Sequence, residues 1–120
     1  MSRILAVDDS PSMRRIMDQI LRSAGYEVIL AADGDEALEF ARRECVNLVL
    51  SDVYMARMDG ISLVQQLRTL EAYRLIPVFL LTTESSPEKK QEGKAAGANG
   101  WILKPFGPER LLSLVAKILN

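Results

Sequence analysis

The chain alternates short apolar runs with longer segments in which apolar residues recur at helical spacing. The apolar runs cover residues 4–7, 28–32, 48–50, 78–81 and 101–103. Because these runs are almost continuously apolar, they are typical of strands buried on both faces of a sheet. The first helical segment starts at Ser10 or Ser12 and stops before Gly25, and the others cover residues 34–43, 61–70, 87–96 and 108–119.

Helical periodicity is clearest in the first of these segments. Its apolar residues recur at i, i+3, i+4, i+7 and i+8, and they are Met13, Ile16, Met17, Ile20 and Leu21. Segment 87–96 is the exception, since it has almost no apolar stripe and contains Gly93. A glycine costs roughly 1 kcal/mol relative to alanine in a helix. We therefore predict that helix 87–96 is loosely held and becomes ordered on activation or binding.

Five strands alternating with five helices predict parallel βαβ units. Right-handed crossovers place helices on both faces, which predicts an α/β fold with a doubly wound, five-stranded parallel sheet. A length of 120 residues suits one domain, so we expect a single domain over residues 1–120. A ligand is expected at the carboxyl ends of the strands, where the strand order reverses.

Composition narrows the class of protein. The chain is 48% apolar and 26% charged, with a net charge of −1, which is typical of a soluble globular protein and argues against a nucleic-acid partner. It has no apolar run near the ~18 residues of a membrane helix and no signal-peptide layout. We therefore expect a cytoplasmic location and no membrane partner. A single cysteine excludes an internal disulfide, and the absence of histidine excludes His-based triads and HExxH zinc sites.

Polar side chains follow four of the five predicted strands. The first strand leads to Asp8 and Asp9, and the third leads to Asp52. The fourth leads to Thr82, and the fifth leads to Lys104. Each of these residues alone has an ordinary explanation, such as a helix cap, a strand residue or a solvated charge. Because the carboxyl ends of parallel strands share one edge of a sheet, their coincidence predicts one functional site.

Three carboxylates at one edge favour a bound cation. Oxygen ligands suit a hard divalent ion, most simply Mg²⁺, which would neutralise the adjacent Asp8 and Asp9. Lys104 adds one positive charge that pairs with Asp52 or binds an anion beside it. An aspartate next to Mg²⁺, a lysine and a hydroxyl is suited to accept a phosphoryl group as an acyl phosphate.

These residues lie in motifs that resemble the response-regulator receiver domain. The motifs are VDD at 7–9, Asp52 followed by MDG at 58–60, LLTT at 80–83 and KPF at 104–106. The stretches DDSPSMRRI and KAAGANGWILKPF are most similar to the stand-alone chemotaxis regulators of the CheY type. The resemblance spans nearly the whole chain and implies a flavodoxin-like, CheY-like sheet of order 2-1-3-4-5. This order is a known property of those proteins and does not come from the spacing.

The resemblance also implies a role for each carboxylate of the site. Asp52 is expected to be the phosphorylated residue, the phosphoacceptor. Asp9 and Asp52 are expected to bind Mg²⁺ directly, together with the backbone carbonyl of Tyr54. Asp8 is expected to act on the ion largely through water.

Two further residues are expected to hold the phosphoryl group, Thr82 by a hydrogen bond and Lys104 by its charge. Trp101 occupies the position of the family's switch aromatic residue and is expected to turn inward when Thr82 moves. The face formed by the fourth helix, the fifth strand and the fifth helix then binds a protein target. The expected partners are a histidine kinase of the chemotaxis type as phosphoryl donor and an output protein such as a flagellar motor switch component.

Some positions depart from the family pattern. Ala56 replaces the proline of the usual Met-Pro pair, which removes a rigid turn. Tyr54 stands where chemotaxis regulators often carry asparagine, beside the path of the attacking water, so we predict that it slows hydrolysis of the phosphoaspartate. Lys90 and Gln91 stand where flagellar-motor regulators often have apolar residues, so motor binding is less supported than phosphotransfer. The sequence leaves both isomers of the bond before Pro105 open.

The sequence therefore predicts a phosphorylation-activated signalling switch of a bacterial two-component system, in chemotaxis, acting as a monomer. We expect it to catalyse only its own phosphotransfer and autodephosphorylation and not to be an enzyme for other substrates. A phosphate sink and a receiver fragment of a larger regulator are the alternatives. A start at Met1 and an end on a fifth helix favour a whole protein.

Two other functional classes fit the sequence less well. An aspartyl-phosphate phosphatase usually has a second aspartate two residues after the nucleophile and a cap domain, but Tyr54 holds that position. A flavin-binding module of the same topology would have a Ser/Thr/Gly-rich phosphate loop after the first strand in place of DDSPS. A yellow colour of the purified protein would favour the flavin module.

Overall fold

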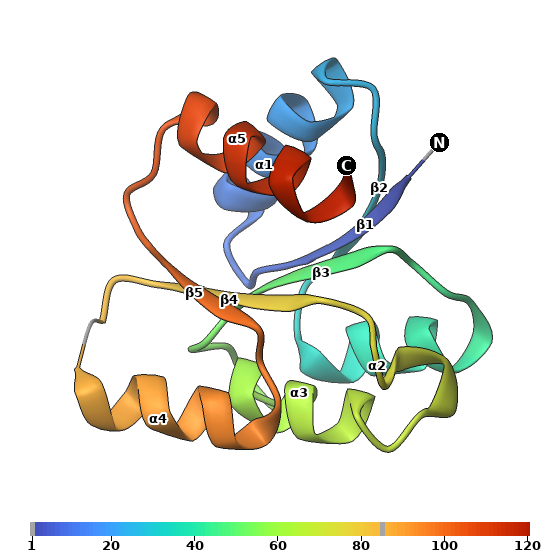
Figure 1. The fold of residues 1–120 in the computed structure, drawn as a ribbon, viewed down its shortest axis with the longest axis vertical. Helices are drawn as coiled ribbons and strands as arrows, with labels where there is room; N and C mark the ends of the chain where they lie inside the picture. Colours follow the sequence, from blue (N-terminus) through green and yellow to red (C-terminus); the bar gives the residue numbers. More distant parts are fainter. Residues whose placement is uncertain (1, 85) are drawn as a thin grey trace.

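A central five-stranded sheet carries helices on both of its faces (Figure 1). The computed structural model describes residues 2–84 and 86–120. In chain order the elements are β1 (Arg3–Val7), α1 (Pro11–Ser23), β2 (Glu27–Ala31), α2 (Gly34–Arg43), β3 (Leu48–Asp52), α3 (Gly60–Leu67), the 3-10 turn η1 (Glu71–Tyr73), β4 (Val78–Thr82), α4 (Pro87–Ala96), β5 (Gly100–Leu103) and α5 (Pro108–Leu119). Among the described residues, no helix has the length and apolar content needed to cross a membrane.

All strands of the sheet run parallel, in the order β2-β1-β3-β4-β5. This confirms the predicted fold class, including the order that the family resemblance implied. The direction of winding reverses between β1 and β3, which lie side by side at the centre of the sheet. Doubly wound sheets bind their ligands at the carboxyl ends of the strands at such a point.

Each face of the sheet has its own apolar core, as alternation along β1 shows. Ile4 and Ala6 pack in the core that α1 and α5 cover. Leu5 and Val7 pack in the core beneath α2 and α3. Figure 1 shows α1 and α5 on one side of the sheet and α2, α3 and α4 on the other. Because all four side chains are buried, β1 appears in the sequence as a continuous apolar run.

Helix α1 begins as predicted, but its buried face is narrower than predicted. The Ser10 hydroxyl caps the helix by accepting a hydrogen bond from Met13 N, 3.2 Å away. Met17 and Leu21 are buried against the sheet, whereas Ile16 is 46% exposed. Ile16 therefore lies outside the core contact, which the other four apolar residues of this helical face make.

The helix predicted over residues 61–70 ends earlier, at Leu67. Beyond it the backbone tightens into i→i−3 hydrogen bonds of 3.0–3.1 Å. The Arg68 guanidinium then donates to the carbonyls of Tyr73 and Ile76, at 2.6 and 2.7 Å. These bonds hold the chain in the turn η1 instead of a longer helix.

Helix α4 forms with clear caps but with little buried surface. Ser86 caps its start by accepting a hydrogen bond from Lys89 N at 3.2 Å, and Gly97 ends it at a φ of 114°. Gly93 is buried, and a Cβ there would lie 2.9 Å from Leu80 Cδ1. Glycine at this position thus lets α4 approach the sheet closely. The loose attachment of α4 stays a prediction.

The segment between β3 and α3 closes tightly although it lacks the proline usual in the family. Gly60 N donates to Val53 O at 2.8 Å. Arg57, at a φ of 66°, forms an ion pair with Asp33 at 3.2 Å. The backbone passes so close to the end of β3 that a Cβ on Gly60 would overlap the Asp52 carbonyl oxygen.

Substitution Gly60→Ala is expected to lower the free energy of unfolding by about 1–3 kcal/mol, because the new methyl group collides with backbone. Urea denaturation at equilibrium measures this change. Gly107→Ala is the matched control, since a Cβ there meets only Glu109 Oε1, at 3.5 Å. Equal stabilities of the two variants would contradict the tight closure beside Asp52.

Candidate functional site

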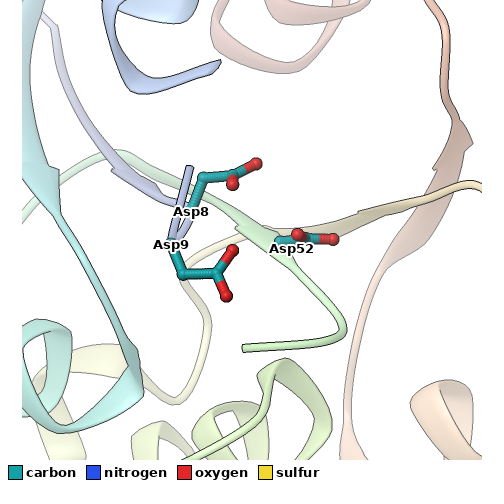
Figure 2. A group of neighbouring side chains, drawn as sticks. All are labelled: Asp8, Asp9 and Asp52. Carbon is teal, nitrogen blue, oxygen red and sulfur yellow. The ribbon is translucent and has the colours of Figure 1, made fainter. Parts of the chain in front are cut away.

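Three aspartates meet at the carboxyl ends of the two central strands. Asp8 and Asp9 directly follow β1, and Asp52 is the last residue of β3. Each offers a carboxylate oxygen, and these oxygens lie within 4.8 Å of one another (Figure 2). The prediction that the three carboxylates converge is confirmed. The strand predicted at 48–50 runs on to Asp52, which pairs in register with Leu81 of β4, so the carboxylate sits on the sheet itself.

Lys104, which follows β5, reaches back to these aspartates. Its Nζ lies 2.9 Å from Asp8 Oδ2 and 3.4 Å from Asp52 Oδ2. Its side chain is only 15% exposed, so the ammonium is held inside the site. The peptide bond between Lys104 and Pro105, whose isomer the sequence left open, is cis.

The oxygen atoms of the three carboxylates differ in what they already bind. Asp8 is buried, and its Oδ1 accepts a hydrogen bond from Ser10 N at 2.9 Å while Oδ2 contacts Lys104. Asp52 is half-buried, and its Oδ1 accepts from Val53 N at 2.9 Å. Asp9 is exposed. Asp9 is therefore the most accessible oxygen donor. Both Asp8 oxygens are engaged, and Asp52 Oδ2 contacts Lys104 at the longer distance of 3.4 Å.

The charges of the site do not balance. Three carboxylates around one ammonium leave two negative charges uncompensated. Burial raises the pKa of Asp52 above the ordinary aspartate value of 3.8; Lys104 opposes this shift and Asp8 adds to it. A donor set made only of oxygen atoms with a surplus of two charges fits a hard divalent cation such as Mg²⁺. The backbone carbonyl of Tyr54 is a further candidate ligand for such a cation. Among the turn and loop hydrogen bonds of the described residues, 2–84 and 86–120, no backbone amide donates to this carbonyl.

Thr82 and Trp101 are both hydrogen-bonded to Glu84, a residue that was not predicted from the sequence. Thr82 ends β4 and is buried, and its Oγ1 accepts a hydrogen bond from Glu84 N at 3.1 Å. Trp101 of β5 is half-buried, and its indole Nε1 donates to the Glu84 carbonyl, also at 3.1 Å. A Cβ at Gly93 would lie 3.3 Å from Trp101 Cζ3, so the indole ring lies against α4.

Glu84 also meets Tyr54, whose hydroxyl donates a hydrogen bond to the Glu84 carboxylate. This bond raises the pKa of Tyr54 to about 12 and lowers the pKa of Glu84. One signal in the sequence points to the pair. Glu84 follows the end of β4 by two positions, as Tyr54 follows the end of β3, and these strands are neighbours. Arg14 of α1 also reaches the site, because its guanidinium donates to the Asp8 carbonyl at 2.7 Å.

Comparison with known proteins agrees with this geometry. Residues 4–116 match the family model of the response regulator receiver domain. The chemotaxis protein CheY4 of Vibrio cholerae is 50% identical, with a TM-score of 0.96 over 99% of both chains. The receiver domain of a sensor histidine kinase from Pseudomonas aeruginosa PAO1 is 31% identical, with a TM-score of 0.91 over 98% of this chain and 96% of that one. Its structure contains a magnesium ion coordinated in the active-site cleft.

Curated relatives include longer proteins. The "Probable transcriptional regulator ycf27" of Porphyridium aerugineum is 39% identical over 118 residues, which is 98% of this chain and 48% of that protein. The chain thus spans about half the length of this relative and of its counterpart from Cyanophora paradoxa. Receiver domains accept phosphoryl groups from histidine kinases, bind Mg²⁺ in an acidic pocket and bind target proteins. Because the family model matches residues 4–116 and the fold agrees with that of solved receiver domains, this chain belongs to the receiver-domain family of two-component response regulators.

Proposed function

We propose that this chain is a phosphorylation-activated switch that receives a phosphoryl group on Asp52 from a histidine kinase, with Mg²⁺ bound beside it. The observation that carries the proposal is the position of the Lys104 ammonium, 2.9 Å from Asp8 and 3.4 Å from Asp52. A lysine held in this way, next to carboxylates that still carry surplus negative charge, is suited to stabilise a transferring phosphoryl group. The chain acts as a catalyst only on itself, in its own phosphotransfer and autodephosphorylation.

In the proposed reaction, a carboxylate oxygen of Asp52 attacks the phosphorus of the kinase's phosphohistidine. The P–N bond breaks, and the imidazole leaves with the electron pair and takes up a proton. Bound Mg²⁺ supplies positive charge that offsets the charge of the transferring group. Asp9, Asp52 and the Tyr54 carbonyl would hold this ion, and Asp8 would act on it through water. Lys104 pairs with a phosphoryl oxygen in the product.

The phosphoryl group then acts on the switch residues. It adds negative charge and acceptor oxygens at Asp52, and the Thr82 hydroxyl donates to one of these oxygens. Movement of Thr82 vacates space that Trp101 fills by turning inward. Since a phosphoryl group shifts an equilibrium only through contacts that differ between two states, these contacts are what select the active conformation.

The proposed output surface is the face formed by α4, β5 and α5. Two clefts flank Trp101 on this face. Lys90 and Lys94 line the cleft against α4, and Arg110 and Lys117 line the cleft against α5. These cations favour a protein target with an acidic segment.

We place the switch in chemotaxis, because the 50% identity with CheY4 extends over 99% of both chains. Transcriptional regulators match over about half of their length, so a fragment of such a regulator and a phosphate sink remain the alternatives. A flagellar motor component is the less supported target, since Lys90 and Gln91 on α4 are polar and exposed. A cytoplasmic location and a monomeric state are further predictions.

Intact mass after incubation with acetyl phosphate tests the proposed function. One phosphoryl adduct is expected in the presence of Mg²⁺ and none in its absence, because the uncompensated carboxylates repel the donor. Asp52→Asn abolishes the adduct, and the control Asp35→Asn, on exposed α2 surface, retains it. An adduct on the Asp52→Asn protein would refute the assigned acceptor. If the wild-type chain forms no adduct, binding of beryllofluoride with Mg²⁺ separates a strict need for the kinase from a receiver that is not phosphorylated.

The Tyr54 side chain is expected to slow hydrolysis of the phosphorylated state. It is 49% exposed and belongs to the segment that follows Asp52, and its hydroxyl bonds to Glu84. Tyr54→Asn should raise the rate of dephosphorylation about tenfold, which corresponds to about 1.4 kcal/mol of activation free energy. Loss of the adduct with time, followed by mass spectrometry, measures the rate. An unchanged rate would show that the ring does not shield the acyl phosphate.

Asp52 is expected to make the metal-free protein less stable. Its pKa is raised in the folded state, mainly by burial, so the folded chain holds more protons than the unfolded chain between the two pKa values. The free energy of unfolding therefore falls as pH rises through that window. In a chelator at pH 7, Asp52→Asn should have a higher thermal midpoint than the wild type, and the difference should shrink as pH falls towards 3.8. A difference that does not depend on pH would contradict this assignment.

A further inference from the structure

Tyr54 and Glu84 face each other across two neighbouring strand ends. Tyr54 follows the last residue of β3 by two positions, and Glu84 follows the last residue of β4 by two. The Tyr54 hydroxyl donates to the Glu84 carboxylate. Lys89, in the first turn of α4, places its Nζ 5.6 Å from the centre of the Tyr54 ring. The Tyr54 side chain therefore spans from the segment after the phosphoacceptor to the start of α4.

Glu84 is bonded on every side. Its second carboxylate oxygen accepts a hydrogen bond from the Ser86 hydroxyl at 2.7 Å, and the same hydroxyl caps α4. Its backbone N–H donates to Thr82 Oγ1, and its backbone carbonyl accepts from Trp101 Nε1, both at 3.1 Å. The side-chain hydrogen bonds of Glu84 thus hold Glu84 in position. The Glu84 backbone in turn contacts Thr82 and Trp101, the two residues assigned to the switch.

This arrangement has a mechanical consequence. A Thr82 hydroxyl that turns towards Asp52 must adjust its bond to the Glu84 amide, and an indole that moves must adjust its bond to the Glu84 carbonyl. Each adjustment either breaks the hydrogen bond or moves the Glu84 backbone with it. The Tyr54 hydroxyl resists such a shift, because it anchors the Glu84 side chain to the segment that follows β3.

We propose that Tyr54 is a positioning residue of the switch: its hydrogen bond to Glu84 forms a latch that sets the positions of Thr82 and Trp101. A regulatory role for the latch rests on the proposed function, because Thr82 and Trp101 are the residues assigned to the phosphorylation switch. It links the segment that carries Asp52 to the output face through side-chain contacts, in addition to any contact made by the phosphoryl group. Breaking the latch frees Trp101 even when Asp52 is not phosphorylated.

Quenching of Trp101 fluorescence by acrylamide tests the latch in the unphosphorylated protein. Trp101 is the only tryptophan of the chain, so the signal has one source. Tyr54→Phe keeps the ring and removes the donor, and Glu84→Ala removes the acceptor. Each should raise the quenching constant above the wild-type value. Because the two groups act through one bond, the double variant should quench no more than Glu84→Ala alone.

Matched controls separate the latch from general loosening. Tyr26→Phe removes a hydroxyl from a half-buried tyrosine away from Glu84, and Glu88→Ala removes an exposed carboxylate from the first turn of α4. Both should quench like the wild type. Quenching of Tyr54→Phe equal to that of the wild type, or effects of Tyr54→Phe and Glu84→Ala that add in full, would overturn the proposal. Circular dichroism of each variant verifies that the helices are retained.

The acetyl phosphate reaction separates failure of the latch from failure of the proposed function. If Asp52 is phosphorylated but Tyr54→Phe leaves Trp101 unchanged, only the latch is wrong. If the variants free Trp101 but no adduct or beryllofluoride complex forms on the wild type, the latch stands as a structural coupling and the phosphoryl switch is wrong. With both intact, beryllofluoride should lower the quenching of Trp101 in the wild type, because the indole turns inward, whereas Tyr54→Phe should raise it in the unphosphorylated protein.

Discussion

An excess of negative charge, held at one edge of the sheet, is the constraint on which the rest of the site depends. Asp8 is buried and Asp52 is half-buried, yet Lys104 compensates only one of the three carboxylates. Buried charge without a full complement of partners is costly. The raised pKa of Asp52, caused mainly by its burial, reflects that cost. The same unsatisfied charge on an all-oxygen donor set fits a divalent cation.

The sheet is what keeps this unfavourable arrangement together. Asp8 and Lys104 are 96 positions apart in the chain, and only the order of the strands brings them into contact. The apolar residues of β1 are buried on both faces, so the aspartates that follow it stand on a rigid support. On the other side of the site, the backbone at Gly60 closes against Asp52 with no room for a side chain. The mutually repelling aspartates are thus held in place by uncharged parts of the chain, the apolar residues of β1 and the backbone at Gly60.

Much of this could be predicted from the sequence because the signals were local. Continuous apolar runs located the five strands, and polar residues at the ends of the runs located the site. The strand order came from a family resemblance, since spacing alone does not determine it. The details that sequence could not supply depend on tertiary geometry. The end of α3 at Leu67 follows from bonds made by Arg68 to carbonyls outside the helix, one of them 29 positions away at Gly97. The exposure of Ile16 follows from which residues of α1 pack on the sheet.

The pairing of Tyr54 with Glu84 belongs to the same group of unpredicted details. Each residue looked like an ordinary polar position after a strand, and only the adjacency of β3 and β4 joins them. The different surroundings of the three aspartates are also a result of geometry. Both oxygens of Asp8 are taken by Ser10 and Lys104, which the order of residues in VDDS does not reveal.

The most direct test of the account is the free energy of unfolding in urea as a function of Mg²⁺ concentration, at constant ionic strength. If the surplus carboxylates form a cation site, the stability of the wild type should rise by about 1.4 kcal/mol for each tenfold increase in Mg²⁺ above the dissociation constant. Asp9→Asn, which removes an exposed carboxylate of the cluster, should shift that rise to higher concentration. A wild-type stability that does not respond to Mg²⁺, or an identical response in Asp9→Asn, would contradict the claim that uncompensated charge at this edge of the sheet is the basis of the site.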